Sequence, residues 1–299
     1  MTPQPTGPRP DAAPREPEAT SPGARTPFGT RLHAALAARG PLCAGIDPHA
    51  GLLHEWGLAD DVAGLERFAL TAVEALAPVV SVVKPQSAFY ERFGSRGVAV
   101  LERVVAASRA AGALVLLDVK RGDIGSTSQA YADAYLDPAS PLACDAITAS
   151  PYLGFGSLDP MFDTARRHDA GVIVLALTSN KEGPEVQHAR LEGGGTVAGR
   201  VLDHLRELNA GAEPLGSFGA VVGATIGETS ERLDVNGPLL APGYGAQGGT
   251  VEDLRRIFGV ASGAVLASSS RGLLRAGPDP RALADAARRA NDELAALRP

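Results

Sequence analysis

The chain has 299 residues, of which 44% are hydrophobic and 21% are charged, and its formal net charge is -6. This composition is typical of a globular protein, and no stretch reaches the roughly 18 uninterrupted apolar residues that a membrane-spanning helix needs. The acidic balance excludes a broad nucleic-acid-binding face, so we expect the partner to be a small molecule.

Residues 1–27 contain eight of the 23 prolines, several charges and almost no large apolar side chains. Such a segment cannot bury enough surface to offset its chain entropy, so we predict a disordered Pro-rich tail. The segment lacks the apolar core of a secretion signal, and its acidic residues Asp11, Glu16 and Glu18 are untypical of an organelle transit peptide.

The two cysteines, Cys43 and Cys144, lack CxxC spacing and lie beside apolar runs. Free cysteine is usually a small buried hydrophobic residue. We therefore predict two reduced thiols, without a disulfide or a metal site, in a cytoplasmic protein.

From residue 28 onward, apolar runs of strand length alternate with Ala- and Leu-rich stretches of helical period, which is typical of βαβ units around a parallel sheet. Eight alternations over about 250 residues favour a (β/α)8 barrel, so we predict an α/β fold with one barrel domain at 28–299. The expected strands are Leu42–Asp47, Val79–Lys84, Ala113–Asp118, Cys144–Ala149, Gly171–Leu177, Gly219–Thr225, Pro238–Ala241 and Gly263–Ala267. The clearest expected helices are Asp60–Leu76, Val98–Ala110, Val197–Leu208, Val251–Phe258 and Arg281–Leu297.

Charged residues follow the apolar runs at several strand ends, where barrel enzymes carry their active sites. Asp47 follows the first run, Lys84 the second, and Asp118 and Lys120 the third, with Asp123 in the loop beyond. Because side chains alternate along a strand, Asp118 and Lys120 project to the same side. We expect these groups to form an alternating row of charge at the barrel mouth.

Lysine is rare in this chain, because only Lys84, Lys120 and Lys181 among its 28 basic residues are lysines. Surface ion pairs are common and stabilise proteins little, which is the ordinary interpretation of an Asp-x-Lys pair. Two of the three lysines, however, end strands that should be buried on both faces. Arginine can hold a carboxylate but does not readily donate a proton, whereas a lysine ammonium does both. We therefore predict a catalytic proton donor.

The stretch from Asp118 to Thr127 reads DVKRGDIGST and resembles the signature of the orotidine 5'-phosphate decarboxylase family, in the longer subgroup of that family. The resemblance covers about residues 28–276 and does not depend on this motif alone. Further matches are Asp47 and Lys84 at the first two strand ends, Ser150-Pro151 after the fourth, the run APGYGAQGG at 241–249, and Arg271 after the eighth.

The resemblance implies decarboxylation of orotidine 5'-monophosphate to uridine 5'-monophosphate and CO2, in pyrimidine biosynthesis and without a cofactor. It implies that Lys120 stabilises a carbanion at C6 of the pyrimidine and then protonates it. Asp118 and Asp123 would hold this ammonium, and Lys84 with Asp47 would connect the row to the ribose hydroxyls.

The remaining matched residues have binding roles in the family. The resemblance implies a homodimer in which Asp123, Ile124 and Thr127 reach the active site of the neighbouring subunit. It also implies that Ser150 and Pro151 contact the pyrimidine. Gln247, Gly248 and Arg271 would bind the phosphate, with glycines allowing close backbone approach.

Two departures from the family pattern stand out. The segment Thr178–Gly199 is an extended loop after the fifth strand, and Gly272 follows Arg271 without a glycine immediately before it.

Two other functions compete with the decarboxylase. A metal-dependent sugar-phosphate lyase would need free carboxylates, and a silent phosphate binder would need only Gln247 and Arg271. None of the six histidines is selected as a site residue, and only His49, close to Asp47, lies near the expected barrel mouth.

Overall fold

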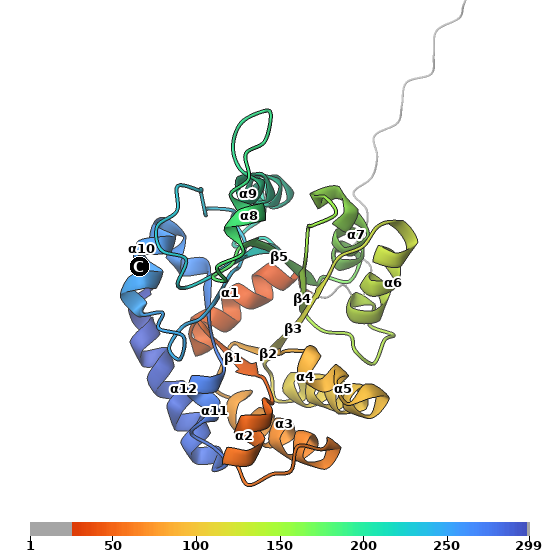
Figure 1. The fold of residues 1–299 in the computed structure, drawn as a ribbon, viewed down its shortest axis with the longest axis vertical. Coiled ribbons are helices and arrows are strands. Elements are labelled where there is room, and N and C mark those ends of the chain that lie inside the picture. Colours follow the sequence, from red (N-terminus) through yellow and green to blue (C-terminus); the bar gives the residue numbers. More distant parts are fainter. Residues whose placement is uncertain (1–25, 298–299) are drawn as a thin grey trace, which may run out of the picture.

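The computed structural model describes residues 26–297, and in it eight parallel strands hydrogen-bond in chain order to form a closed barrel (Figure 1). The predicted (β/α)8 architecture is confirmed. The strands are β1 Leu42–Ile46, β2 Val82–Pro85, β3 Leu114–Arg121, β4 Ala146–Ala149, β5 Gly171–Leu177, β6 Phe218–Val222, β7 Leu239–Pro242 and β8 Val265–Ser269.

Helices surround the barrel, and the five expected ones are present as α3, α5, α9, α10 and α12. The α-helices are α1 Phe28–Arg39, α2 Ala50–Glu55, α3 Val62–Leu76, α4 Ala88–Glu91, α5 Gly94–Ala110, α6 Gly125–Leu136, α7 Asp159–Arg167, α8 Pro184–Gln187, α9 Val197–Leu208, α10 Val251–Phe258, α11 Arg271–Leu274 and α12 Pro280–Leu294. Short 3-10 helices are η1 Phe155–Leu158, η2 Gly259–Ala264 and η3 Ala295–Leu297.

The barrel interior is a packed core to which every strand contributes at least one inward side chain. These side chains are Cys43, Val82, Leu116, Ala146, Ile173, Val221, Leu240 and Leu266. Helix α1 lies across the centre of the barrel in Figure 1, and its Phe28, Leu32 and Leu36 pack into this core. Arg31 on the same helix reaches Asp145 just before β4, with an N–O distance of 2.5 Å. The end of the barrel opposite the strand C-termini is thereby closed.

Strand boundaries differ from expectation by two or more residues in β2, β3, β4, β6 and β8, and for three of these strands the structure gives the reason. β3 continues beyond Asp118 to Arg121, with a shift in its register against β4. β6 ends at Val222, because the next backbone amides bond to the ends of β5 and β7 instead of continuing the strand. β8 begins at Val265, because residues 259–264 form η2.

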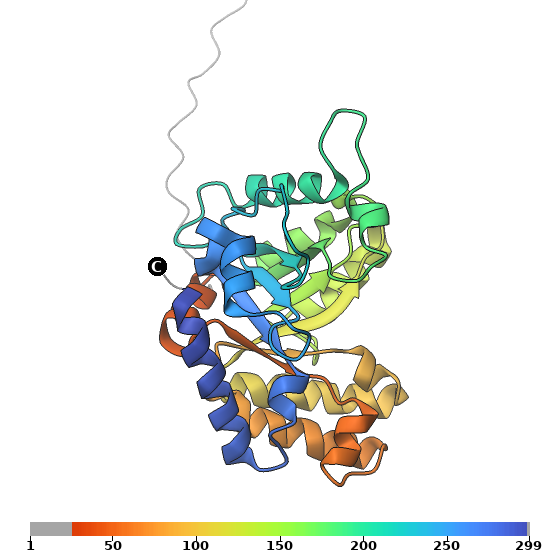
Figure 2. The ribbon, with the colours of Figure 1, turned by 60° about the vertical axis from the view of Figure 1, so that its left-hand side comes forward.

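The expected Pro-rich tail at 1–27 lies outside the described residues apart from Thr26 and Pro27. Within residues 26–297, no helix is long and apolar enough to cross a membrane. The extended segment after β5 contains α8 and then projects away from the barrel before α9 begins (Figure 2). A β-bridge between Arg190 and Thr196 closes the base of this projection.

Candidate active site

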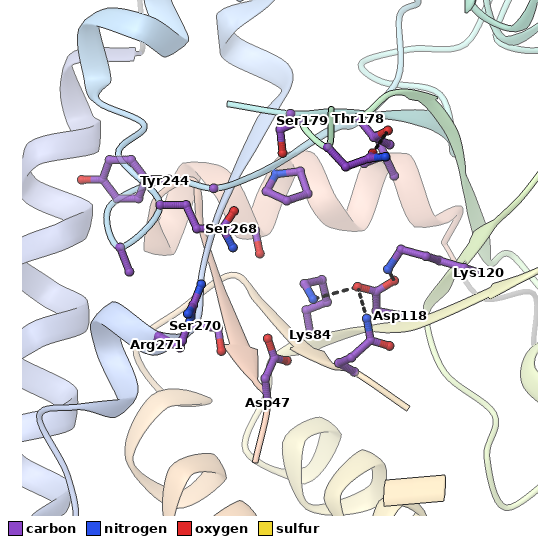
Figure 3. A pocket seen from close by; sticks show the side chains of 18 of the residues that line it. Asp47, Lys84, Asp118, Lys120, Thr178, Ser179, Tyr244, Ser268, Ser270 and Arg271 are labelled. Atoms are coloured by element: carbon purple, nitrogen blue, oxygen red, sulfur yellow. Dashed lines mark hydrogen bonds and ion pairs between the residues drawn. The ribbon is translucent and has the colours of Figure 1, made fainter. Parts of the chain in front are cut away.

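A cavity of about 540 Å³ opens at the C-terminal ends of the strands. The inward-facing positions that fill the barrel core continue upward into the cavity wall. Cys43 is followed on the same side by Asp47, and Val82 is followed by Lys84. Asp118 and Lys120 follow Leu116 on β3 in the same way, so the strand alternation delivers all four charged groups to one space (Figure 3).

Asp118 is the centre of this charged cluster. Its Oδ2 lies 3.0 Å from Lys84 Nζ and accepts a hydrogen bond of 3.1 Å from Gln86 Nε2. Its Oδ1 lies 2.6 Å from Lys120 Nζ and accepts a hydrogen bond of 2.8 Å from the Thr148 hydroxyl. One buried carboxylate therefore holds two ammonium groups from neighbouring strands.

The electrostatics of the cluster keep its buried members charged. Burial alone would lower the pKa of Lys84, but Asp118 and Asp47 outweigh burial and raise that pKa above its ordinary value. Burial alone would raise the pKa of Asp118, but Lys84 and Lys120 outweigh burial and lower it. The side chains of Lys84 and Asp118 are 6% and 8% exposed, whereas that of Lys120 is 44% exposed and faces the cavity.

Asp47 and His49 form the next part of the wall, on the loop after β1. Oδ1 of Asp47 is buried and has no hydrogen-bond partner. Such an orphaned acceptor suits a ligand that brings its own donor, such as a hydroxyl group. The His49 ring packs against Phe89 at 4.2 Å between centroids, and burial together with Arg271 lowers its pKa, while Asp47 opposes this.

Gln247, after β7, and Arg271, at the start of α11, also line the cavity, and Figure 3 shows Arg271 on the side away from Lys120. The glycine-rich loop between Gly243 and Gly249 folds back on itself, because the Gly249 amide donates to the Gly243 carbonyl at 3.0 Å. Gly243 has a φ of 103°, a left-handed conformation that favours glycine. The loop is also fixed to α12, because the Tyr244 hydroxyl donates to Glu293 at 2.9 Å.

Comparison with known proteins identifies the family. Residues 40–287 match the family described as Orotidine 5'-phosphate decarboxylase / HUMPS family. The chain belongs to this family. Curated proteins named orotidine 5'-phosphate decarboxylase from Nocardioides sp. and Salinispora arenicola are 76% and 67% identical over 271 and 263 residues. These alignments cover 90% and 88% of this chain, and 98% and 95% of the relatives.

Solved structures agree with this assignment. A crystal structure of a Streptomyces avermitilis protein described as an orotidine 5'-phosphate decarboxylase superposes with a TM-score of 0.91 at 61% identity, covering 93% of this chain and 98% of that one. The Leishmania donovani UMP synthase structure superposes with a TM-score of 0.73 at 32% identity, covering 91% of this chain and 57% of that one. The sequence resemblance to the orotidine 5'-phosphate decarboxylase family is confirmed.

Some residues that the family resemblance selected lie away from this cavity within the single chain. Asp123 accepts a hydrogen bond from the Ile124 amide at 2.8 Å, and neither residue lines the cavity. Ile124 is 62% exposed, and Thr127 is also exposed. The chain alone therefore does not place Asp123 against Lys120.

Ser150 and Pro151 line a second cavity, which lies beside the first and has a volume of about 540 Å³. The two cavities share Leu175, Asn180 and Gln187 in their walls. Gly248 lies on the outer side of the glycine-rich loop and lines a third cavity, toward α12.

Several residues in or beside the cavity were not predicted from the sequence. Gln86 and Thr148 bond directly to Asp118, and Ser268 and Ser270 line the cavity. Gln86 follows Lys84 at i+2, so the alternation that selected Lys120 after Asp118 also points to Gln86. Thr148 sits inside an apolar run and carries no such signal.

The described residues contain no group of three or more His, Cys, Asp or Glu side chains placed to hold a metal ion. Cys43 and Cys144 are free and buried, and burial raises the pKa of each thiol to about 12.

Proposed function

We propose that this protein decarboxylates orotidine 5'-monophosphate to uridine 5'-monophosphate and CO2, with Lys120 as the proton donor. The observation that carries the proposal is the buried Asp118 carboxylate between Lys84 and Lys120, at one end of a cavity whose other end holds Gln247 and Arg271. An anionic nucleotide would span this cavity with its phosphate at the arginine and its base at Lys120.

Loss of CO2 from C6 of the pyrimidine leaves an electron pair that no adjacent carbonyl is positioned to delocalise. A fixed ammonium is the direct way to stabilise such a charge, because it requires no reorganisation as the charge develops. Lys120 can then transfer a proton to C6, so that hydrogen replaces the departing carboxyl group. Asp118, held by Lys84, Gln86 and Thr148, aims the ammonium and remains ionised throughout.

The phosphate end would contribute binding energy away from the reacting carbon. Arg271 supplies a permanent positive charge, and the Gln247 amide supplies a donor. The loop that carries Gln247 contains glycines, so its backbone amides can approach an anion closely. Energy gained at this end can hold the base in its reacting position. Asp47, whose Oδ1 has no hydrogen-bond partner in the chain, would accept a hydrogen bond from a ribose hydroxyl.

We also propose a homodimer with shared active sites, in which Asp123, Ile124 and Thr127 serve the partner's cavity. This is supported by the exposure of Ile124 and Thr127 within one chain, and by Asp123 not lining the cavity that holds the charged cluster. A cytoplasmic location and a single catalytic domain at 28–299 belong to the same proposal, and the two free buried thiols support the location.

The activity is tested by following the ultraviolet absorbance of orotidine 5'-monophosphate with purified protein, with and without excess EDTA. We expect the absorbance change of decarboxylation at equal rates in both samples. An unchanged absorbance would refute the decarboxylase assignment. A decarboxylation that EDTA abolishes would show that the reaction needs a metal ion and would contradict the cofactor-independent mechanism.

The shared site is tested by mixing two inactive variants, Lys120→Ala and Asp123→Ala, under conditions that allow subunit exchange. If Asp123 acts in the partner's site, a mixed dimer contains one site with both residues intact, and activity returns. If Asp123 acted within its own chain, every site in the mixture would lack one group, and the mixture would remain inactive.

A further inference from the structure

The backbone of Lys120 has an unusual conformation. Its φ is 45°, in the left-handed region that residues with a side chain rarely adopt. The residue lies where β3 loses its regular pairing with β4, because the register shifts between Leu117 and Arg121. Neither sheet pairing nor intrinsic preference accounts for this conformation, so another contact must hold it.

Thr148 on β4 provides that contact. Its hydroxyl oxygen accepts a hydrogen bond of 2.9 Å from the Lys120 amide and donates one of 2.8 Å to Oδ1 of Asp118. Thr148 is fully buried, so water cannot replace either bond. The same Oδ1 is the oxygen that Lys120 Nζ contacts at 2.6 Å. The Thr148 hydroxyl therefore contacts both the backbone of Lys120 and the carboxylate oxygen that binds the Lys120 ammonium.

The chemistry of the two partners fixes the direction of both bonds. The lowered pKa of Asp118 keeps it as a carboxylate, which can only accept, so the Thr148 proton must point toward it. The Lys120 amide can only donate, so it must use a lone pair of the same oxygen. Threonine is also stiff at χ1, which keeps this oxygen at one place.

We propose that Thr148 is a positioning residue, whose hydroxyl fixes the Lys120 backbone and the Asp118 carboxylate and so aims the ammonium at the reacting carbon. The proposal builds on the proposed decarboxylase function and adds a residue that acts through Lys120 and Asp118 without touching the substrate. Loss of the hydroxyl leaves the Lys120 amide and one carboxylate lone pair without partners, and frees the ammonium to shift.

The test compares Thr148→Val with Thr148→Ser. Valine keeps the shape and removes both hydrogen bonds, whereas serine keeps the hydroxyl and removes only a methyl group. We expect Thr148→Val to lower kcat about 10-fold to 100-fold while KM changes less than about threefold, because small misplacements of reacting groups cost rates of this size. Thr148→Ser should recover most of kcat.

A matched control is Thr164→Val, at a threonine of α7 that is equally buried and hydrogen-bonded to Gln129 and Arg167. It should lower the melting temperature comparably while leaving kcat unchanged. Crystal structures of the wild type and Thr148→Val then locate Lys120, whose φ and Nζ position should change in the variant.

Two results would overturn the proposal. One is a Thr148→Val variant with wild-type kcat, and the other is a Thr148→Ser variant as slow as Thr148→Val. Both results require a wild-type enzyme that is active. They therefore differ from a failure of the proposed decarboxylase function, in which the wild type itself would be inactive.

Discussion

Replacing Asp118 by asparagine should be costly, and the cost should depend on pH. The Asp118 side chain is 8% exposed and holds Lys84 and Lys120 at 3.0 and 2.6 Å. Asparagine has the same shape but no charge, so two ammonium groups would face each other without their counter-ion. Removing one partner of a buried ion pair costs about 3–5 kcal/mol. For a chain of this size, that cost lowers the melting temperature by about 10 °C.

The pH dependence of this cost follows from the signs of the two pKa shifts. The pKa of Asp118 is lowered, so its stabilisation is complete above its unfolded pKa of about 3.9 and is lost as pH falls. The pKa of Lys84 is raised, so its stabilisation is complete below its unfolded pKa of about 10.4 and is lost as pH rises. The difference between wild type and Asp118→Asn should therefore be largest between about pH 5 and pH 9.

Melting curves followed by circular dichroism from about pH 2 to about pH 9 measure this difference. Asp163→Asn is the control, because Asp163 pairs with Arg166 on the surface and should give a shift near zero at every pH. A difference below about 3 °C at pH 7, or a large difference that does not shrink as the pH falls from about 5 to about 2, would show that the buried carboxylate does not stabilise the two lysines.

Three further substitutions test the assigned roles. Lys120→Ala should lower kcat by at least about 10⁴-fold, because the proton donor is lost. The melting temperature should change little, because the Lys120 side chain is 44% exposed. A variant that retains a few per cent of the activity would contradict the assigned role. Arg271→Ala should raise KM about tenfold to hundredfold in steady-state assays, and an unchanged KM would remove it from the site. Gly249→Ala should raise KM, because the new Cβ would lie 2.8 Å from the Gly243 carbonyl oxygen, whereas Gly193→Ala meets nothing within 4 Å and should match the wild type in KM.

The sequence predicted the barrel and the charged cluster because both depend on short-range periodicity. Strand alternation was enough to place Asp118 and Lys120 on one side, and the ends of neighbouring strands brought Lys84 beside them. Parallel strands buried on both faces also leave long apolar runs, which made all eight strands recognisable.

Periodicity could not reveal features that arise from contacts between strands. Thr148 lies in an apolar run, and only the register shift between β3 and β4 brings its hydroxyl under Lys120. Helix α1 precedes the first strand and so lies outside the βαβ alternation, which therefore does not predict it. Asp123 was selected from the family resemblance, and within one chain it does not line the cavity that holds Lys120.

The closure of the barrel by α1 has a consequence for the release of products. Phe28, Leu32 and Leu36 fill the far end, so gas released at Lys120 has no route through the barrel axis. In the proposed reaction, CO2 therefore leaves on the side of the strand C-termini, the same side on which the nucleotide enters, so gas release and nucleotide exchange share one face of the barrel.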